Sequence, residues 1–290
     1  MSSLLSITDT LIQGVLLGGL YALFALGQAL MFGVMRLTNT AHGDFIILSA
    51  FAALAVVASG INPFIGGLVV LPLAFAVGYG LQRFPLNGTL GKDPLPSLVV
   101  TFGLSIVIQN LLMELFTADP RSIDSMGLNT GSVKLSDSLT IGVMPLLILA
   151  LALACTMAMQ WLFNSTQLGR SFRAVSDDPE VAQLMGLKSS HLYALATAIA
   201  FVLVALAGVL QAMRSTVSPT DGPALLLFAF EAVIIGGMGS FWGTFAGAMI
   251  LGIAQQIGFR LDPGWGIWFG HIVFLTLLLF RPQGLMPKTR

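Results

Sequence analysis

Long apolar segments follow one another along almost the whole chain, and they constrain its fold more than any other feature. They cover residues 10–35, 45–60, 62–82, 95–116, 141–163, 191–213, 223–239, 241–259 and 266–281. A membrane-spanning helix needs about 20 mostly apolar residues, and only helices or closed barrels satisfy the backbone amides in hydrocarbon. These segments lack the alternation of a barrel strand. The pattern therefore predicts an all-α polytopic membrane protein with eight to nine transmembrane helices, including broken or re-entrant segments.

The composition agrees with this class and excludes others. Hydrophobic residues make up 56% of the 290 residues and charged residues only 9%, so we expect a single transmembrane domain over residues 1–290. Because 13 basic residues balance 13 acidic residues, the chain lacks the charged field typical of a nucleic-acid partner. No Lys or Arg precedes Arg36, so we expect the first apolar segment to stay in the lipid bilayer rather than to be cleaved as a signal.

The Lys and Arg residues divide the loops between two sides of the membrane, because basic loops stay cytoplasmic. Eight of them fall on one side when three segments are placed together: 83–94, 165–190 and 281–290. The loops on the other side hold four. This distribution predicts that 165–190 is a cytoplasmic loop and that 117–140 is the main extracytoplasmic loop.

The segment 45–59 leaves the number of crossings open. Its helix would be about 22 Å long, shorter than the hydrocarbon core of about 30 Å. If it crosses, there are nine crossings with the N-terminus outside; if it does not, there are eight with both termini inside. The lack of basic residues before Arg36 favours nine, whereas the short length favours eight.

A polar island interrupts this apolar chain between the fifth and sixth apolar segments. Its charged residues are Arg170, Arg173, Asp177, Asp178, Glu180 and Lys188. Apolar Val181, Leu184 and Met185 follow at helical spacing, which predicts a short amphipathic helix. One interpretation is a solvated loop with a helical turn. The other is a docking element, because an exposed apolar face of this kind suits a groove in a partner protein.

The ends of this short helix are marked by typical capping residues. Asp177 and Asp178 precede Pro179, so an aspartate can cap the first free amides while proline takes the first helical position. Glu180 is favoured there by the helix dipole. Gly186 can adopt the left-handed conformation that ends the helix.

Three blocks of the sequence carry a family resemblance. They read "GLYALFALGQALMFGVMRLTNTAHGDFIILSA", "GRSFRAVSDDPEVAQLMGL" and "AFEAVIIGGMGSFWGTFAGAMILGI". In this order they resemble the first helix and following turn, the coupling loop and the glycine motif of LivH-type permease subunits, which belong to ABC importers of branched-chain amino acids. The departures are Phe241-Trp242 in place of the usual Ile-Pro and Thr40 in place of a common Phe. They bear on the identity of the substrate more than on the fold.

The resemblance implies a permease subunit in a bacterial or archaeal inner membrane. Such a subunit forms a path for branched-chain or related hydrophobic amino acids, or for urea, amides or aromatic acids. Its implied partners are two ATP-binding subunits, a second permease subunit that would make a heterodimer or a homodimer, and an extracytoplasmic substrate-binding protein.

The resemblance also assigns the polar island to ATPase coupling. The residues concerned are Gly169, Arg170, Arg173, Ala174, Asp177, Asp178, Glu180, Val181, Leu184, Met185 and Gly186. The nearest approach to a phosphate-binding loop, "GTLGKDP", lacks the required spacing and hydroxyl. We therefore expect no enzymatic activity and no cofactor on this chain, with ATP and Mg held by the partner subunits.

Polar and small residues inside two apolar stretches are candidates for the translocation path. They are Asn39, His42, Gly43, Asp44, Glu231, Gly236, Gly237, Gly239 and Ser240. The first four interrupt the helix pattern, which favours either a cavity-lining break or a short interfacial loop capped by the aspartate. Glu231 either lines the path or holds a neighbouring helix. The glycines favour helix packing or a helix break, and the ligands are too few for a metal site.

An alternative function is a self-sufficient channel or an ion-coupled secondary carrier. A channel of the water and glycerol type should carry paired Asn-Pro-Ala turns, and only Asn62-Pro63-Phe64 occurs here. A carrier would place more ionisable groups at the middle of the membrane.

Overall fold

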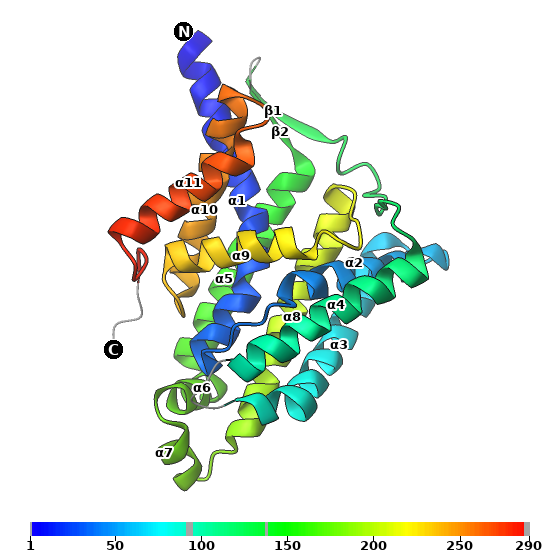
Figure 1. Cartoon of the computed structure of the whole chain (residues 1–290). Helices are drawn as coiled ribbons and strands as arrows, with labels where there is room; N and C mark the ends of the chain where they lie inside the picture. Colours follow the sequence, from blue (N-terminus) through cyan, green and yellow to red (C-terminus); the bar gives the residue numbers. More distant parts are fainter. Residues whose placement is uncertain (1, 91–94, 137–138, 287–290) are drawn as a thin grey trace.

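The computed structural model describes residues 2–90, 95–136 and 139–286, and most of them are helical (Figure 1). The α-helices are α1 (Ser2–Met35), α2 (His42–Ala58), α3 (Pro63–Leu81), α4 (Leu95–Phe116), α5 (Val143–Ser165), α6 (Gln167–Asp177), α7 (Pro179–Leu184), α8 (Ser189–Arg214), α9 (Gly222–Gly236), α10 (Phe241–Leu261) and α11 (Gly266–Phe280). After α3, the chain continues through η1 (Gln82–Leu86) and η2 (Asn87–Thr89). Lys92, Lys288 and Arg290, which the loop assignment included, lie outside the described residues.

One element departs from the all-α prediction. The strands β1 (Ser132–Ser136) and β2 (Leu139–Gly142) pair antiparallel, with Val133 opposite Ile141 and Lys134 opposite Thr140. β1 lies within the predicted extracytoplasmic loop 117–140, and β2 extends two residues beyond it. Two short strands that bury little apolar surface leave only a weak periodic signal in a polar loop.

Five helical segments of the described chain are long and apolar enough to cross a membrane alone: Ile7–Met35, Pro63–Thr89, Leu95–Phe116, Val143–Ser165 and Ser189–Arg214. Helices α9 and α10 are bent by 118° at a short break, and counting them as one span gives six. Helices α2 and α11 are shorter. Length and composition therefore do not reach the eight to nine spans expected from the sequence.

The core of the bundle is formed by α1 and α8. Every side chain from Leu16 to Met31 of α1 is buried, as expected for a helix that is apolar on all sides and surrounded by protein. Helix α1 packs closely along α10, and a Cβ added at Gly14 would lie 2.6 Å from the Cα of Ile253. The small residue at this position therefore allows backbone contact between the two helices.

The outer helices expose apolar side chains instead. Examples are Leu68 on α3, Val99 on α4, Trp161 on α5, and Trp268 and Leu279 on α11, all more than 60% exposed. In water such a surface would be unfavourable, whereas lipid tails are as apolar as these side chains. The arrangement of a buried centre and an apolar outside is that of a multi-pass membrane protein.

The loops with an excess of basic residues meet at one end of the bundle, where α6 and α7 lie (Figure 1). Ser176 Oγ donates to the Gly33 carbonyl near the end of α1, at 2.8 Å. Arg83 donates to Ser190 Oγ at 2.8 Å. The C-terminal segment reaches the same region, since the Met286 amide donates to the Gly236 carbonyl.

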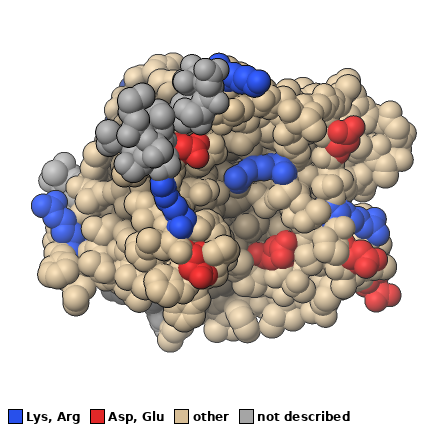
Figure 2. Space-filling model, turned by 90° about the horizontal axis from the view of Figure 1, so that it is seen from above, with Lys and Arg blue, Asp and Glu red and all other residues tan. Residues whose placement is uncertain are grey.

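The β-hairpin and the start of α1 lie at the opposite end (Figure 1). The Asn129 side chain donates to the Met213 carbonyl at 2.6 Å, which holds the loop 117–140 on the end of α8. Arg260, at the end of α10, donates to Thr10 at 2.8 Å. Figure 2 looks on to this end and shows only a few charged side chains scattered among uncharged ones. The chain therefore starts at the hairpin end, whereas residue 286 lies at the α6 end.

Candidate functional site

Helix α6 is fixed to the end of α5. The Thr166 hydroxyl accepts from the Gly169 amide at 3.1 Å and caps the helix. A Cβ added at Gly169 would lie 2.6 Å from the Cα of Phe163, so only glycine fits between the two helices. Arg173 donates to the Phe163 carbonyl, one of the free carbonyls at the end of α5. Gly169 and Arg173, assigned to coupling from the sequence, thus build the base of the loop.

Helix α7 has the capping expected from its sequence. Asp178 accepts hydrogen bonds at 3.0 Å from the amides of Glu180 and Val181, and Pro179 occupies the first turn. At the other end Gly186 has a φ of +87°, and the Leu187 amide donates to the Ala182 carbonyl at 3.0 Å. These bonds form a Schellman motif. Helix α7 is therefore a short but well-defined rod.

An exposed apolar surface covers the tip of this loop. Val181 is 53% exposed, Leu184 87% and Met185 80%. The remaining residues of the coupling assignment, other than Gly169 and Arg173, are also exposed: Arg170, Ala174, Asp177, Asp178, Glu180 and Gly186. We call Val181, Leu184 and Met185 the α7 patch. Helices α6 and α7 project from the end of the bundle (Figure 1).

The break between α1 and α2 lies inside the bundle. The His42 imidazole Nε2 donates to the Phe24 carbonyl at 2.8 Å. Phe24 precedes the end of α1 by about three turns, roughly 16 Å along the helix axis. Residues 36–41 therefore return into the bundle, and α2 starts at depth with His42, Gly43 and Asp44 all buried.

Helix α4 supplies polar partners to this break. Gln109 Nε2 donates to Asp44 Oδ1 at 2.9 Å, and the hydroxyls of Thr40 and Thr101 lie 2.8 Å apart. Of the polar residues Gln109, Asn110 and Glu114 on this helix, only Gln109 turns inward, whereas the other two are exposed. Thr101, Ser105 and Gln109 recur at every fourth position, and this helical spacing is the signal that would have found them.

Several buried polar atoms near the break have no hydrogen-bond partner among the described residues. They are Asn39 Nδ2, His42 Nδ1, Asp44 Oδ2 and both side-chain polar atoms of Gln28. Unsatisfied buried groups are rare in proteins and call for an explanation.

The start of α9 meets the start of α2 at the same depth. A Cβ added at Gly43 would lie 2.7 Å from the Leu226 amide nitrogen and closer still to the Gly222 carbonyl oxygen. A Cβ added at Gly222 would lie 2.6 Å from Asp44 Cγ. The two helix starts therefore touch through their backbones, which no larger residue would permit.

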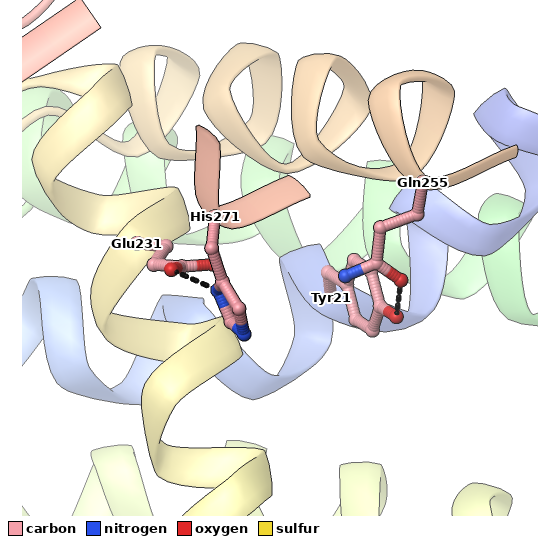
Figure 3. A network of polar contacts seen from close by, with 4 residues as sticks. All are labelled: Tyr21, Glu231, Gln255 and His271. Carbon is pink, nitrogen blue, oxygen red and sulfur yellow. Dashed lines mark hydrogen bonds and ion pairs between the residues drawn. The ribbon is translucent and has the colours of Figure 1, made fainter. Parts of the chain in front are cut away.

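Glu231 joins α9 to α11 through an ion pair. Its Oε1 lies 2.5 Å from His271 Nδ1, and the glutamate is 1% exposed. The Phe228 ring stacks on the rings of His271 and Tyr21. The Tyr21 hydroxyl donates to Gln255 at 2.6 Å (Figure 3). Glu231 therefore holds a neighbouring helix, one of the two roles considered for it.

Glu231 also lines a cavity of about 280 Å³ between α9 and α11. The other residues around this cavity are Pro223, Leu226, Leu227, Phe230 and Phe274. Both roles considered for the glutamate are thus compatible with its position.

Gly236, Gly237, Gly239 and Ser240 form the sharp turn between α9 and α10. Gly237 and Gly239 have φ values of +103° and +85°, which favour glycine, and Ser240 caps α10 by accepting from the Gly243 amide at 3.1 Å. These residues lie beside Gly33 at the α6 end. Within the described part of the chain, no three His, Cys, Asp or Glu side chains are placed to hold a metal ion.

The comparisons with known proteins agree with this arrangement. Residues 10–281 match the family described as branched-chain amino acid transport system / permease component. The high-affinity branched-chain amino acid transport system permease protein BraD of Pseudomonas aeruginosa is 28% identical, over 96% of this chain and 95% of its own length. The corresponding LivH protein of Escherichia coli K12 is 27% identical, over 95% and 94%.

A relative with a different printed substrate is also similar. The fructose import permease protein FrcC of Rhizobium meliloti is 27% identical, over 76% of this chain and 69% of its own length. The family match extends from the first turns of α1 to the residue after α11 and includes the break, the coupling loop and the glycine turn. The chain therefore belongs to the family of branched-chain amino acid transport system permease components.

Proposed function

We propose that the chain is the membrane-spanning subunit of an ABC importer, and that it passes ATP-driven movements from separate ATPase subunits to a solute path. The observation that carries the proposal is the α7 patch. It is an apolar surface on a capped rod, held at the end of the bundle where the basic loops meet. A short helix of this kind suits a groove in a partner protein.

The attachment of the loop supports a mechanical role. Helix α6 is bonded to the end of α5 through Arg173 and to the end of α1 through Ser176. The chain leaves α7 directly into α8, one of the two central helices. A force applied to the α7 patch therefore acts on three membrane helices at once.

The path would pass the region where α2 and α9 begin. Both helices start inside the bundle, and transporters commonly bind solutes where such interrupted helices end at depth. We assign nine crossings, with the N-terminus outside. In this count residues 36–41 and α2 together make one crossing, and residues 216–221 and α9 together make another. Support comes from the start of α1 at the hairpin end and from the position of residue 286 at the other.

The partners and the solute follow from the relatives. An importer of this class needs two ATP-binding subunits, a second permease subunit, and an extracytoplasmic protein that delivers the solute. ATP and Mg would bind to the ATPase subunits, and the inner membrane is the location. Branched-chain or related hydrophobic amino acids are the proposed solutes, since the two relatives that cover nearly the whole chain are named for them.

Co-purification in mild detergent tests the proposal. Val181, Leu184 and Met185 are changed together to Asp in the tagged chain, which should release the ATPase subunits. The matched control changes Met126 and Val133 to Asp, two apolar residues in the loop at the opposite end that are 57% and 45% exposed. The control should keep the complex. A wild-type chain that purifies alone and moves solute into liposomes without ATP would instead be a channel or an ion-coupled carrier.

A further inference from the structure

A second cavity, of about 400 Å³, lies between α1, α8 and α9 toward the hairpin end of the bundle. Its volume falls in the range of about 300–1,000 Å³ that is usual for small-molecule sites. Aromatic rings of Tyr21, Phe24 and Phe228 form much of its wall, and Gln211 and Arg214 from the end of α8 also line it.

The Arg214 side chain lines this cavity without a counter-ion. It is half-buried, and among the described residues no carboxylate lies within ion-pair distance of it. A guanidinium that is partly withdrawn from water and unpaired favours an anionic ligand, above all a carboxylate.

The cavity also contains an acceptor. Gln211 donates through Nε2 to Ser215 Oγ at 3.0 Å, whereas its Oε1 is buried and has no partner among the described residues. A carbonyl oxygen in this state can accept a hydrogen bond from an ammonium group. A cationic group, a hydrogen-bond acceptor and aromatic side chains therefore line the same cavity.

The wall is held rigidly and connects to the break described above. The Tyr21 hydroxyl is bonded to Gln255 (Figure 3), and the Tyr21 ring stacks on Phe228 with centroids 4.9 Å apart. Phe24 is also the residue whose carbonyl accepts from His42. Phe24 thus connects the wall of this cavity to the start of α2.

We propose that this cavity binds a small hydrophobic α-amino acid on its way into the path, with Arg214 on the carboxylate, Gln211 on the ammonium group and the aromatic rings on the side chain. The inference rests on the proposed function and assigns its solute class. A lipid phosphate is the other anion that could meet Arg214, and the experiment separates the two.

The test uses cysteine protection in the assembled complex in proteoliposomes. Cys155 is changed to Ala and Leu225, which lines the cavity, to Cys. We expect L-leucine to slow labelling by a small polar thiol reagent, whereas isoamylamine, which lacks the carboxylate, should not. Arg214→Gln should raise the leucine concentration needed for protection about 10-fold or more, as for a lost charge-assisted hydrogen bond. Arg214→Lys keeps the charge, so the leucine concentration that it needs for protection should lie between those of the wild type and Arg214→Gln.

Arg260→Gln is the matched control, because Arg260 lies at the same end of the bundle and bonds to Thr10 outside the cavity. It should leave protection unchanged. If leucine gives no protection while the ATPase subunits co-purify, the cavity assignment is wrong, whereas the proposed function as an importer subunit is still supported. If anionic lipid slows labelling and leucine does not, Arg214 holds a lipid and the assignment is again wrong. Loss of the ATPase subunits from the wild-type complex would instead refute the proposed function.

Discussion

The contact between the starts of α2 and α9 gives a sharp prediction for Gly43→Ala. The added methyl would lie 2.7 Å from the Leu226 nitrogen and 2.8 Å from the Gly222 carbonyl carbon, whereas ordinary contact begins at 3.4 Å. All these neighbours are backbone atoms, so no side chain can move aside. The two helices would have to separate by roughly half an ångström or more, and overpacking of this kind costs about 1–3 kcal/mol.

Thermal unfolding of the purified chain in detergent measures this loss, and uptake in proteoliposomes measures its effect on transport. We expect Gly43→Ala to lower the unfolding temperature and to lose most of its uptake, because the Asp44 and Gln109 bond lies beside the contact. Gly103→Ala is the matched control, since nothing lies within 4 Å of an added Cβ there. Alanine should be neutral or slightly stabilising at that position. Wild-type stability and uptake in Gly43→Ala would refute the backbone contact.

Three further predictions follow from single bonds or dihedral angles. Glu231→Ala and His271→Ala should each destabilise the chain, and a double-mutant cycle by thermal unfolding should give a coupling of about 1 kcal/mol or more; additive effects would contradict the ion pair. Asp178→Ala should cost α7 about 1 kcal/mol, seen as faster hydrogen exchange of its first amides, and unchanged exchange would count against the cap. Gly186→Ala places a side chain at φ +87°, with a cost of about 1–2 kcal/mol; it should weaken solute-stimulated ATPase activity, and full stimulation would show that the end of α7 is not needed.

The sequence predicted the elements that depend on local chemistry. The start of α7 at Asp178 and Pro179 and its end at Gly186 were foreseen, because capping involves only residues next to one another in the chain. The apolar segments likewise predicted the helices, since the length of an uncharged segment is a local property.

Contacts between distant segments were not predictable in the same way. His271 bonds to Glu231 forty residues away, and Gln109 reaches Asp44 over sixty-five. Nothing in a hydropathy pattern tells which of several neighbouring polar residues turns inward, as Gln109 does. Helix lengths do not give the number of spans for a related reason: α2 starts inside the bundle, and residues 36–41 before it are not helical.

The two candidate sites are joined by one rigid element. Helix α8 has 26 residues, about 39 Å of helix, and begins next to α7 while its last residue, Arg214, lines the aromatic cavity. Its core-facing side packs on α1, α2 and α3, so it cannot bend freely along its length. A displacement of the α7 patch would therefore reach Arg214 as a shift or rotation of the whole of α8. The same displacement would reach α1, which carries Tyr21 and Phe24, through the hydrogen bond between Ser176 and Gly33. Because the guanidinium and part of the aromatic wall belong to different helices, a relative movement of α8 and α1 would change the shape of the cavity. Under the proposed function, nucleotide-driven closure would release a bound solute in this way.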